Sequence, residues 1–233
     1  KLKLRASYGQ VGNANLGGRR FAYRSTITDD YETLNMYKWG LDSSYGLTGM
    51  AEGEFAVQDL TWEIVNKMNL GVELGFLNGM IDLQLDYFDE RRKDIFMPRE
   101  SVPMTAGFMK QPWKNFGKVT NQGVEVSLNV NKQFGKDLFV SLMGTFTYAH
   151  NEITEKDEPS AVVGTNRAET GHPVGQLTGY IAEGLFTADD FEDVSTGKLK
   201  EGIPTQSFVG KLRPGDMLYR DVNGDGKINS NDQ

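Results

Sequence analysis

The stretch Trp62–Glu90, WEIVNKMNLGVELGFLNGMIDLQLDYFDE, decides the fold, because two alternating segments meet there at Asn78-Gly79. Asn-Gly between such segments predicts a β-hairpin, since a type I′ turn requires positive φ at both central residues. A two-residue loop sets Leu77 opposite Met80. The pairs that follow on one face are all apolar: Phe76/Ile81, Leu74/Leu83, Val72/Leu85 and Leu70/Tyr87.

The other face of this hairpin is polar. Its predicted pairs are Gly75/Asp82, Glu73/Gln84 and Gly71/Asp86. Side chains alternate between the two faces of a strand, so one face meets apolar surroundings and the other meets water.

A second hairpin repeats this chemistry around the turn Gly135-Lys136-Asp137. When Phe134 is set opposite Leu138, the sequence again places apolar residues in pairs on one face: Val130/Leu142, Val126/Phe146 and Val124/Tyr148. The alternation therefore predicts two long hairpins of the same kind.

Strands are expected at residues 1–8, 61–77, 80–90, 122–134 and 138–149. The connections between them alternate between short turns and long irregular stretches, and residues 151–233 form a further long loop. All tight turns then lie at one end of the sheet and all large loops at the other. Structureless loops this long are uncommon in compact soluble domains but usual in outer-membrane barrels.

Aromatic residues gather at both ends of the expected strands. A bilayer-spanning sheet carries two such belts. The residues concerned are Phe76, Phe134 and Phe139 near the tight turns, and Tyr8, Trp62, Tyr87 and Tyr148 toward the loops. The sequence predicts an all-β fold, part of an antiparallel transmembrane β-barrel in contact with outer-membrane lipid. The alternative is a soluble secreted β-sandwich that binds calcium and glycans and buries its apolar face as a core.

Composition excludes several functions for the 233-residue chain. Its net charge of −7 and lack of a basic stripe argue against a nucleic-acid partner. There is no cysteine, so disulfides and thiolate metal sites are excluded. The only histidines, His150 and His172, do not have a zinc-ligand spacing. No pair of carboxylates stands out as a hydrolase site, and we expect no enzymatic activity.

The segment Asp221–Asp232 has the spacing of a calcium-binding loop. Calcium prefers six to eight oxygen ligands, and a glycine at the sixth position permits the sharp turn that brings them together. Gly226 occupies that position, and Asp232 stands where such loops usually carry glutamate. The expected ligands of a structural Ca²⁺ are Asp221, Asn223, Asp225, the backbone carbonyl of Lys227, Asn229 and Asp232.

Two tryptophans in different long loops, Trp39 and Trp113, are candidates for stacking on a sugar ring. Tryptophans in loops also commonly hold the loop in place by packing. Both interpretations stay open at this stage.

Taken together, the motifs resemble the SusC/RagA type of TonB-dependent outer-membrane transporter found in Bacteroidetes. The likeness covers the whole sequence, and its motifs come in a specific order. They are the segments 2–13, 60–63, 78–79, 86–88, 115–125, 183–186, 214–216 and 219–228.

The resemblance implies a barrel of about 22 strands with an N-terminal plug. It implies import of oligosaccharides or peptides across the Gram-negative outer membrane, together with a SusD-like surface lipoprotein and the TonB–ExbB–ExbD complex. The plug, the TonB box and the final strand have no counterpart in residues 1–233. We therefore expect the chain to be part of the barrel with its extracellular loops.

Overall fold

The computed structural model describes residues 1–28, 37–42, 45–47, 50–108, 110–206 and 208–233. The chain divides into two compact units. The first comprises Lys1–Pro159 with Thr170–Val174, and the second comprises Ser160–Glu169 with Gly175–Gln233.

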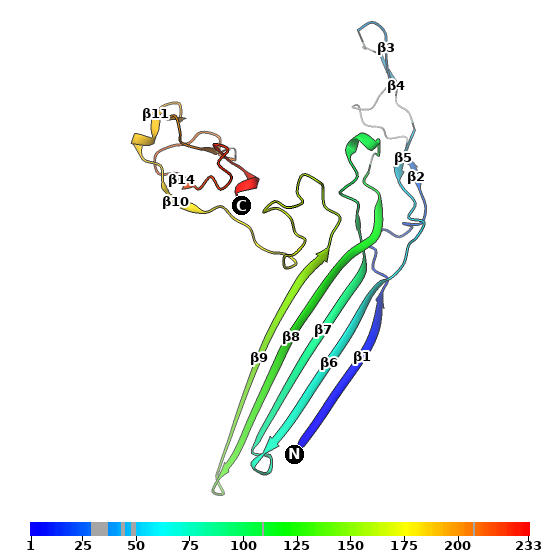
Figure 1. The fold of residues 1–233 in the computed structure, drawn as a ribbon, viewed down its shortest axis with the longest axis vertical. Coiled ribbons are helices and arrows are strands. Elements are labelled where there is room, and N and C mark those ends of the chain that lie inside the picture. The colour runs from blue at the N-terminus through cyan, green and yellow to red at the C-terminus, as the bar shows by residue number, and fades with distance from the viewer. Residues whose placement is uncertain (29–36, 43–44, 48–49, 109, 207) are drawn as a thin grey trace. The chain divides into compact units, whose positions relative to one another are not determined.

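The first unit is built on one five-stranded antiparallel sheet of order β1-β6-β7-β8-β9 (Figure 1). The two tight turns of this sheet lie at the same end, as predicted. Its strands are β1 (Leu2–Asn13), β6 (Glu63–Phe76), β7 (Ile81–Pro98), β8 (Trp113–Phe134) and β9 (Leu138–Glu155).

The first hairpin has the predicted register from Phe76/Ile81 to Leu70/Tyr87. Asn78 and Gly79 have φ values of 56° and 87°, as a type I′ turn requires. The N–H of Met80 donates to the carbonyl of Leu77 at 3.2 Å. Leu77 also has a positive φ of 48°, so the predicted Leu77/Met80 pair lies in the turn and not in the strand ladder.

The second hairpin also has the predicted register. Phe134 lies opposite Leu138, and the three apolar pairs that follow are formed: Val130/Leu142, Val126/Phe146 and Val124/Tyr148. The alternation of side chains was therefore sufficient to fix the pairing in both hairpins.

The strands extend further toward the loops than the sequence predicted. The long connection expected between the strands 80–90 and 122–134 is shorter than predicted, because β7 continues to Pro98 and β8 begins at Trp113. The register shifts between Arg92 and Ile95, and Asp94 has a φ of 59°. This β-bulge interrupts the alternation on which the prediction relied.

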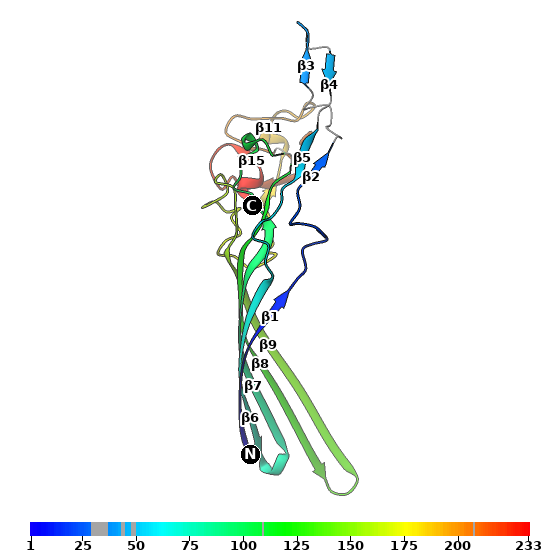
Figure 2. The same cartoon turned by 90° about the vertical axis from the view of Figure 1, so that its right-hand side faces the viewer.

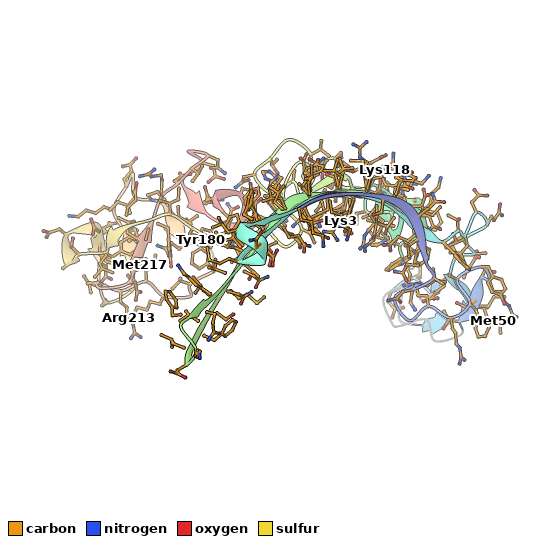
Figure 3. The ribbon with its side chains drawn as sticks, turned by 90° about the horizontal axis from the view of Figure 1, so that it is seen from below. Lys3, Met50, Lys118, Tyr180, Arg213 and Met217 are labelled. Atoms are coloured by element: carbon orange, nitrogen blue, oxygen red, sulfur yellow. The ribbon has the colours of Figure 1, made fainter. Side chains whose placement is uncertain are left out.

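The sheet is curved, and its two faces differ in chemistry. Seen from below, it bends into an arc with Lys3 on the concave side (Figure 3). The face opposite Lys3 is apolar and open; Phe146 on it is 61% exposed. Other exposed residues of this face are Leu2, Leu4, Tyr8, Leu70, Phe76, Leu85, Tyr87, Val124, Leu128, Leu138, Leu142 and Tyr148. The soluble-sandwich alternative is wrong, since that fold requires this face to be buried.

The apolar face ends at a row of aromatic residues toward the loops. Tyr87 and Tyr148 lie in that row, and the next residue on the same face of β7 is Asp89, which pairs with Arg91 at 3.0 Å. The aromatic residues of both predicted belts are exposed: Tyr8, Trp62, Phe76, Tyr87, Phe134, Phe139 and Tyr148. Phe139, however, lies opposite Gln133 on the concave face and is not part of a belt on the apolar face.

The loop end of the first unit carries short elements that the sequence did not predict (Figure 2). Two small antiparallel pairs are β2 (Thr26–Thr28) with β5 (Ala51–Glu54), and β3 (Tyr37–Trp39) with β4 (Tyr45–Leu47). A 3₁₀ turn, η3, spans Met104–Ala106. Within the described ranges, no helix is both long and apolar enough to cross a membrane.

The second unit falls within the predicted long loop 151–233, and it contains short strands and 3₁₀ turns around a small core. The core consists of Phe186, Phe191 and Leu212. The elements are β10 (Ala182–Leu185), η4 (Ala188–Asp190), β11 (Phe191–Asp193), β12 (Lys198–Leu199), β13 (Thr205–Gln206), β14 (Met217–Tyr219), β15 (Lys227–Ile228) and η5 (Ser230–Asp232).

Candidate functional site

The concave face of the sheet carries a row of ion pairs across β1, β6 and β7. Lys3 and Arg5 contact Glu73 at 3.2 and 3.1 Å. Arg5 also donates to both carboxylate oxygens of Asp86 at 2.9 Å. Gln84 donates to Asp86 at 2.8 Å. The charges of this row are therefore paired with one another, as expected for a wall in contact with water.

Gly71 makes the contact between Arg5 and Asp86 possible. It lies between them in the register, and a Cβ at Gly71 would be 2.4 Å from Asp86 Oδ1. Gly123 plays a similar part on β8, because a Cβ there would be 2.5 Å from the ring of Phe88. Both glycines leave space for a larger neighbour on the concave face.

A groove of about 650 Å³ lies at the loop end of the same sheet. Its floor includes Val65 and Ile153, which are only 6% and 7% exposed. Val65 and Ile153 lie in one cross-strand row with Arg92 and Val119. A volume of this size is typical of a site for a small ligand.

The β-bulge in β7 shapes this groove. Beyond the bulge, Ile95 and Met97 line the groove together with Arg92. The side-chain amide of Asn115 donates to the carbonyls of Asp94 and Thr61 at 2.8 and 3.0 Å. Asn115 also accepts a hydrogen bond from the N–H of Thr61 at 3.0 Å. Asn115 thus holds the irregular backbone next to the groove.

Asp157 joins the end of β9 to the connection between β7 and β8. One of its oxygens accepts hydrogen bonds from Arg99 at 2.8 Å and from the hydroxyl and N–H of Ser101 at 3.0 and 3.2 Å. Burial raises the pKa of Asp157, but the hydrogen bonds from Arg99 and Ser101 outweigh burial, so its pKa lies below the ordinary value. The ionised carboxylate of Asp157 therefore links the end of β9 to the connection between β7 and β8. We call its contacts with Arg99 and Ser101 the Asp157 latch.

Of the two candidate tryptophans for sugar stacking, the structure describes the side chain of Trp113 but not that of Trp39. Trp113 has the guanidinium of Arg19 over its ring, 4.2 Å from the centroid, and Phe96 packs against it at 5.1 Å. Trp113 thus holds this region together by packing. The backbone of Trp39 lies in β3, but its side chain is outside the described residues.

In the predicted calcium loop, side-chain oxygens accept hydrogen bonds from backbone N–H groups of the same loop. Asp221 accepts hydrogen bonds from the N–H groups of Gly224 and Gly226, both at 2.7 Å. Asn223 accepts from the N–H of Asp225 at 2.9 Å, and Asp225 accepts from Lys227 at 2.8 Å. Gly226 has a φ of 77°, which allows the sharp turn expected of the sixth position.

Asp232 is buried at the end of this loop, with 1% of its surface exposed. Its carboxylate accepts hydrogen bonds from the N–H groups of Val222 at 3.0 Å and Asn229 at 2.8 Å. Among the described residues, no three acidic or histidine side chains are gathered as a metal-binding group. Oxygen donors of the type calcium prefers are present at loop positions 1, 3, 5 and 12: Asp221, Asn223, Asp225 and Asp232.

The groove is the feature that sequence reasoning missed. The available signal was Val65, an apolar residue in the expected strand 61–77 at a position where the alternation predicts a polar one; Val119 and Ile153 lie outside the expected strands. Only the strand register brings the three residues into one row. The pairing of residues 118–121 with residues 151–155 was not predicted.

The whole chain is similar to known receptors. Residues 1–228 match the sequence model of the family described as TonB dependent receptor-like, beta-barrel. The chain is 29% identical to the TonB-dependent receptor SusC of Bacteroides thetaiotaomicron, over 100% of its own length and 22% of that protein. It is 25% identical to the TonB-dependent receptor P3 of Formosa agariphila, with 99% and 22% covered.

Solved structures share the fold. The structure of the RagAB peptide transporter has a TM-score of 0.55 and 24% identity, covering 85% of this chain and 20% of that one. The RagAB peptide importer in the "closed-closed" state has a TM-score of 0.56 and 22% identity, with 94% and 22% covered. The chain thus spans about a fifth of the length of these relatives.

The family match agrees with the geometry of the sheet. An exposed apolar convex face and a charged concave face are what the wall of an outer-membrane barrel presents to lipid and to its interior. The family consists of receptors and not of enzymes. The chain therefore belongs to the TonB-dependent receptor family and forms part of the wall of an outer-membrane β-barrel.

Proposed function

We propose that the protein containing this chain is an active importer of the outer membrane that takes up oligosaccharides or peptides. Import would be driven through TonB–ExbB–ExbD, and a SusD-like lipoprotein would act as its partner at the cell surface. The relatives named SusC and RagAB support this proposal.

The observation that carries the proposal is the division of the sheet into two faces. The convex residues Leu85 and Phe146 are open to the surroundings, while Arg5, Glu73 and Asp86 pair with one another on the concave face. A wall of this kind separates lipid from a watery interior, through which a polar nutrient can pass.

The test is nutrient uptake by cells that carry the full-length protein. Labelled oligosaccharides and peptides are offered to cells with and without TonB, and to cells that lack the SusD-like partner. We expect uptake of at least one class that stops when TonB is removed. Uptake that continues at the same rate without TonB would contradict the proposal.

We also propose that the Asp221–Asp232 loop binds a structural Ca²⁺. Asp221, Asn223, Asp225, the carbonyl of Lys227, Asn229 and Asp232 would supply its ligands. The spacing and the left-handed Gly226 support this assignment. When bound, the ion would neutralise these carboxylates and hold β15 in place beside β13. Removal of calcium from the full-length protein tests this assignment.

A further inference from the structure

The side chains that line the loop-end groove favour one of the two proposed substrate classes, peptides, over the other, oligosaccharides. We propose that it binds a short peptide with an aliphatic side chain and a free C-terminal carboxylate. This inference rests on the proposed import function and narrows its substrate class.

The floor of the groove fits an aliphatic side chain. Val65 and Ile153 are buried there, and Ile95, Met97 and Val119 add apolar side chains, next to the amides of Asn121 and Asn151. The volume of about 650 Å³ is sufficient for a few amino-acid residues. Burial of one aliphatic side chain on this floor favours binding through the hydrophobic effect.

The rim of the groove fits the ends of a peptide. Arg92 and Lys118 line it, and their side chains are 48% and 50% exposed. Arg92 contacts Glu63 at 2.8 Å through one nitrogen, and Lys118 pairs with Glu155. A guanidinium has five N–H donors and an ammonium has three, so both retain donors for a carboxylate. Glu90 and Glu155 also line the groove and suit a peptide amine.

The groove lacks an aromatic side chain on which a sugar ring could stack. None of the described residues that line it is aromatic. Two aromatic side chains elsewhere on the sheet are already engaged, since Trp113 packs with Arg19 and Phe96, and the ring of Phe88 lies over Gly123. Apolar floor, charged rim and missing ring faces together favour a peptide over an oligosaccharide.

The experiment uses the purified full-length transporter and isothermal titration. The probes are the tripeptide Ala-Leu-Ala, the same peptide with an amidated C-terminus, and maltoheptaose. We expect Ala-Leu-Ala to bind, and the amide to bind about fivefold more weakly because the rim cations lose their partner. No binding of Ala-Leu-Ala, or binding of maltoheptaose alone, would overturn the inference.

Matched variants test whether the peptide binds in this groove. Met97→Gln removes apolar contact at similar length and should weaken binding about threefold or more. Lys118→Gln should reduce the preference for the free carboxylate, because only Arg92 then remains as a cationic partner. The controls are Met143→Gln and Lys3→Gln, which change the same residue types near the tight-turn end; Lys3 is 54% exposed and also ion-paired. Equal binding by all four variants would overturn the inference.

Failure of the inference is distinguishable from failure of the proposed function. TonB-dependent uptake of maltoheptaose without any peptide binding would remove the peptide assignment and leave the importer in place. Peptide binding in this groove without TonB-dependent uptake would support the site and contradict active import.

Discussion

Arg5 and Asp86 form a two-point ion pair at 2.9 Å across the backbone of Gly71, so one residue on each of three neighbouring strands defines the contact. The Asp86 side chain is 7% exposed, whereas that of Arg5 is 37% exposed. Loss of the guanidinium would leave a nearly buried carboxylate without its main partner, which is more costly than the pair is stabilising.

Gly71→Ala should separate Arg5 from Asp86, because its Cβ would be 2.4 Å from Asp86 Oδ1. We expect a loss of about 1–3 kcal/mol of stability in the full-length protein. The measurement is heat-dependent unfolding of the barrel in detergent, followed by gel mobility. Gly9→Ala is the control, since nothing lies within 4 Å of a Cβ at Gly9. Equal midpoints for the two variants would argue against the role given to Gly71.

Val126→Arg should impair membrane insertion, because Val126 lies in the middle of the apolar face, opposite Phe146 and Leu85. An arginine at bilayer mid-depth costs about 2–4 kcal/mol. Ser127→Arg places the same charge on the concave face of the same strand and should be tolerated. Quantities of folded protein in the outer membrane are compared. A larger loss for Ser127→Arg would reverse our assignment of the two faces.

Asn115→Asp should loosen the bulge beside the groove, since a carboxylate oxygen would then face the carbonyls of Asp94 and Thr61. Loss of two hydrogen bonds and the new repulsion should cost about 2 kcal/mol locally. Hydrogen exchange at Ile95 and Met97 measures the effect, and Asn129→Asp, near the tight turns of the same strand, is the control. Unchanged exchange at both positions would mean that Asn115 does not hold the bulge.

The latch formed by Asp157 should weaken in acid. Its pKa is lower in the folded protein than the value of about 3.9 expected when unfolded. The carboxylate therefore stabilises the latch above that value, and this contribution is lost as the pH falls below it and through the folded pKa. We expect the protection factor of the Ser101 N–H, which is its intrinsic exchange rate at each pH divided by its measured rate, to fall in acid.

Asp157→Asn should reproduce that acid effect near neutral pH, at a cost of about 1–3 kcal/mol to the latch. Asp137→Asn, in an exposed tight turn, serves as the reference variant. If the protection factor of Ser101 in the Asp157→Asn protein is still larger at neutral pH than in acid, some other group is responsible for the pH dependence.

Calcium should stabilise the second unit. With a Kd of about 0.1–1 mM, as in extracellular calcium modules, about 10 mM Ca²⁺ adds roughly 1.4–2.7 kcal/mol. Limited proteolysis of the full-length protein within residues 175–233 should slow with calcium and accelerate with chelator. Asp225→Ala should abolish the difference, while Asp189→Ala, outside the loop, should preserve it. Identical digestion with calcium and with chelator would rule out the assignment.

The sequence predicted the central part of the sheet well, because alternation and the Asn78-Gly79 turn leave one possible register. Both hairpins pair as the alternation predicts, from Phe76/Ile81 and from Phe134/Leu138. Exposure of the apolar face then follows from the same alternation and from the lack of a second covering sheet in the described residues.

The loop end was predicted poorly for a physical reason. The bulge at Asp94 reverses which residues share a face, so alternation no longer reports on the strand. The second unit depends on side-chain hydrogen bonds and very short strands, which leave no periodic pattern. Pairs such as Arg99 with Asp157 connect residues far apart in the chain, and composition alone does not reveal them.

The height of the apolar face has a consequence for the membrane in which the protein resides. On β9 this face runs from Leu138 to Tyr148, and a tilted strand of about that length covers roughly 25 Å of depth. That depth matches a thin bilayer and falls several ångströms short of an average one of about 30 Å. In a thicker membrane, lipid tails beside the sheet would have to compress, and this hydrophobic mismatch would favour retention in the thinner membrane.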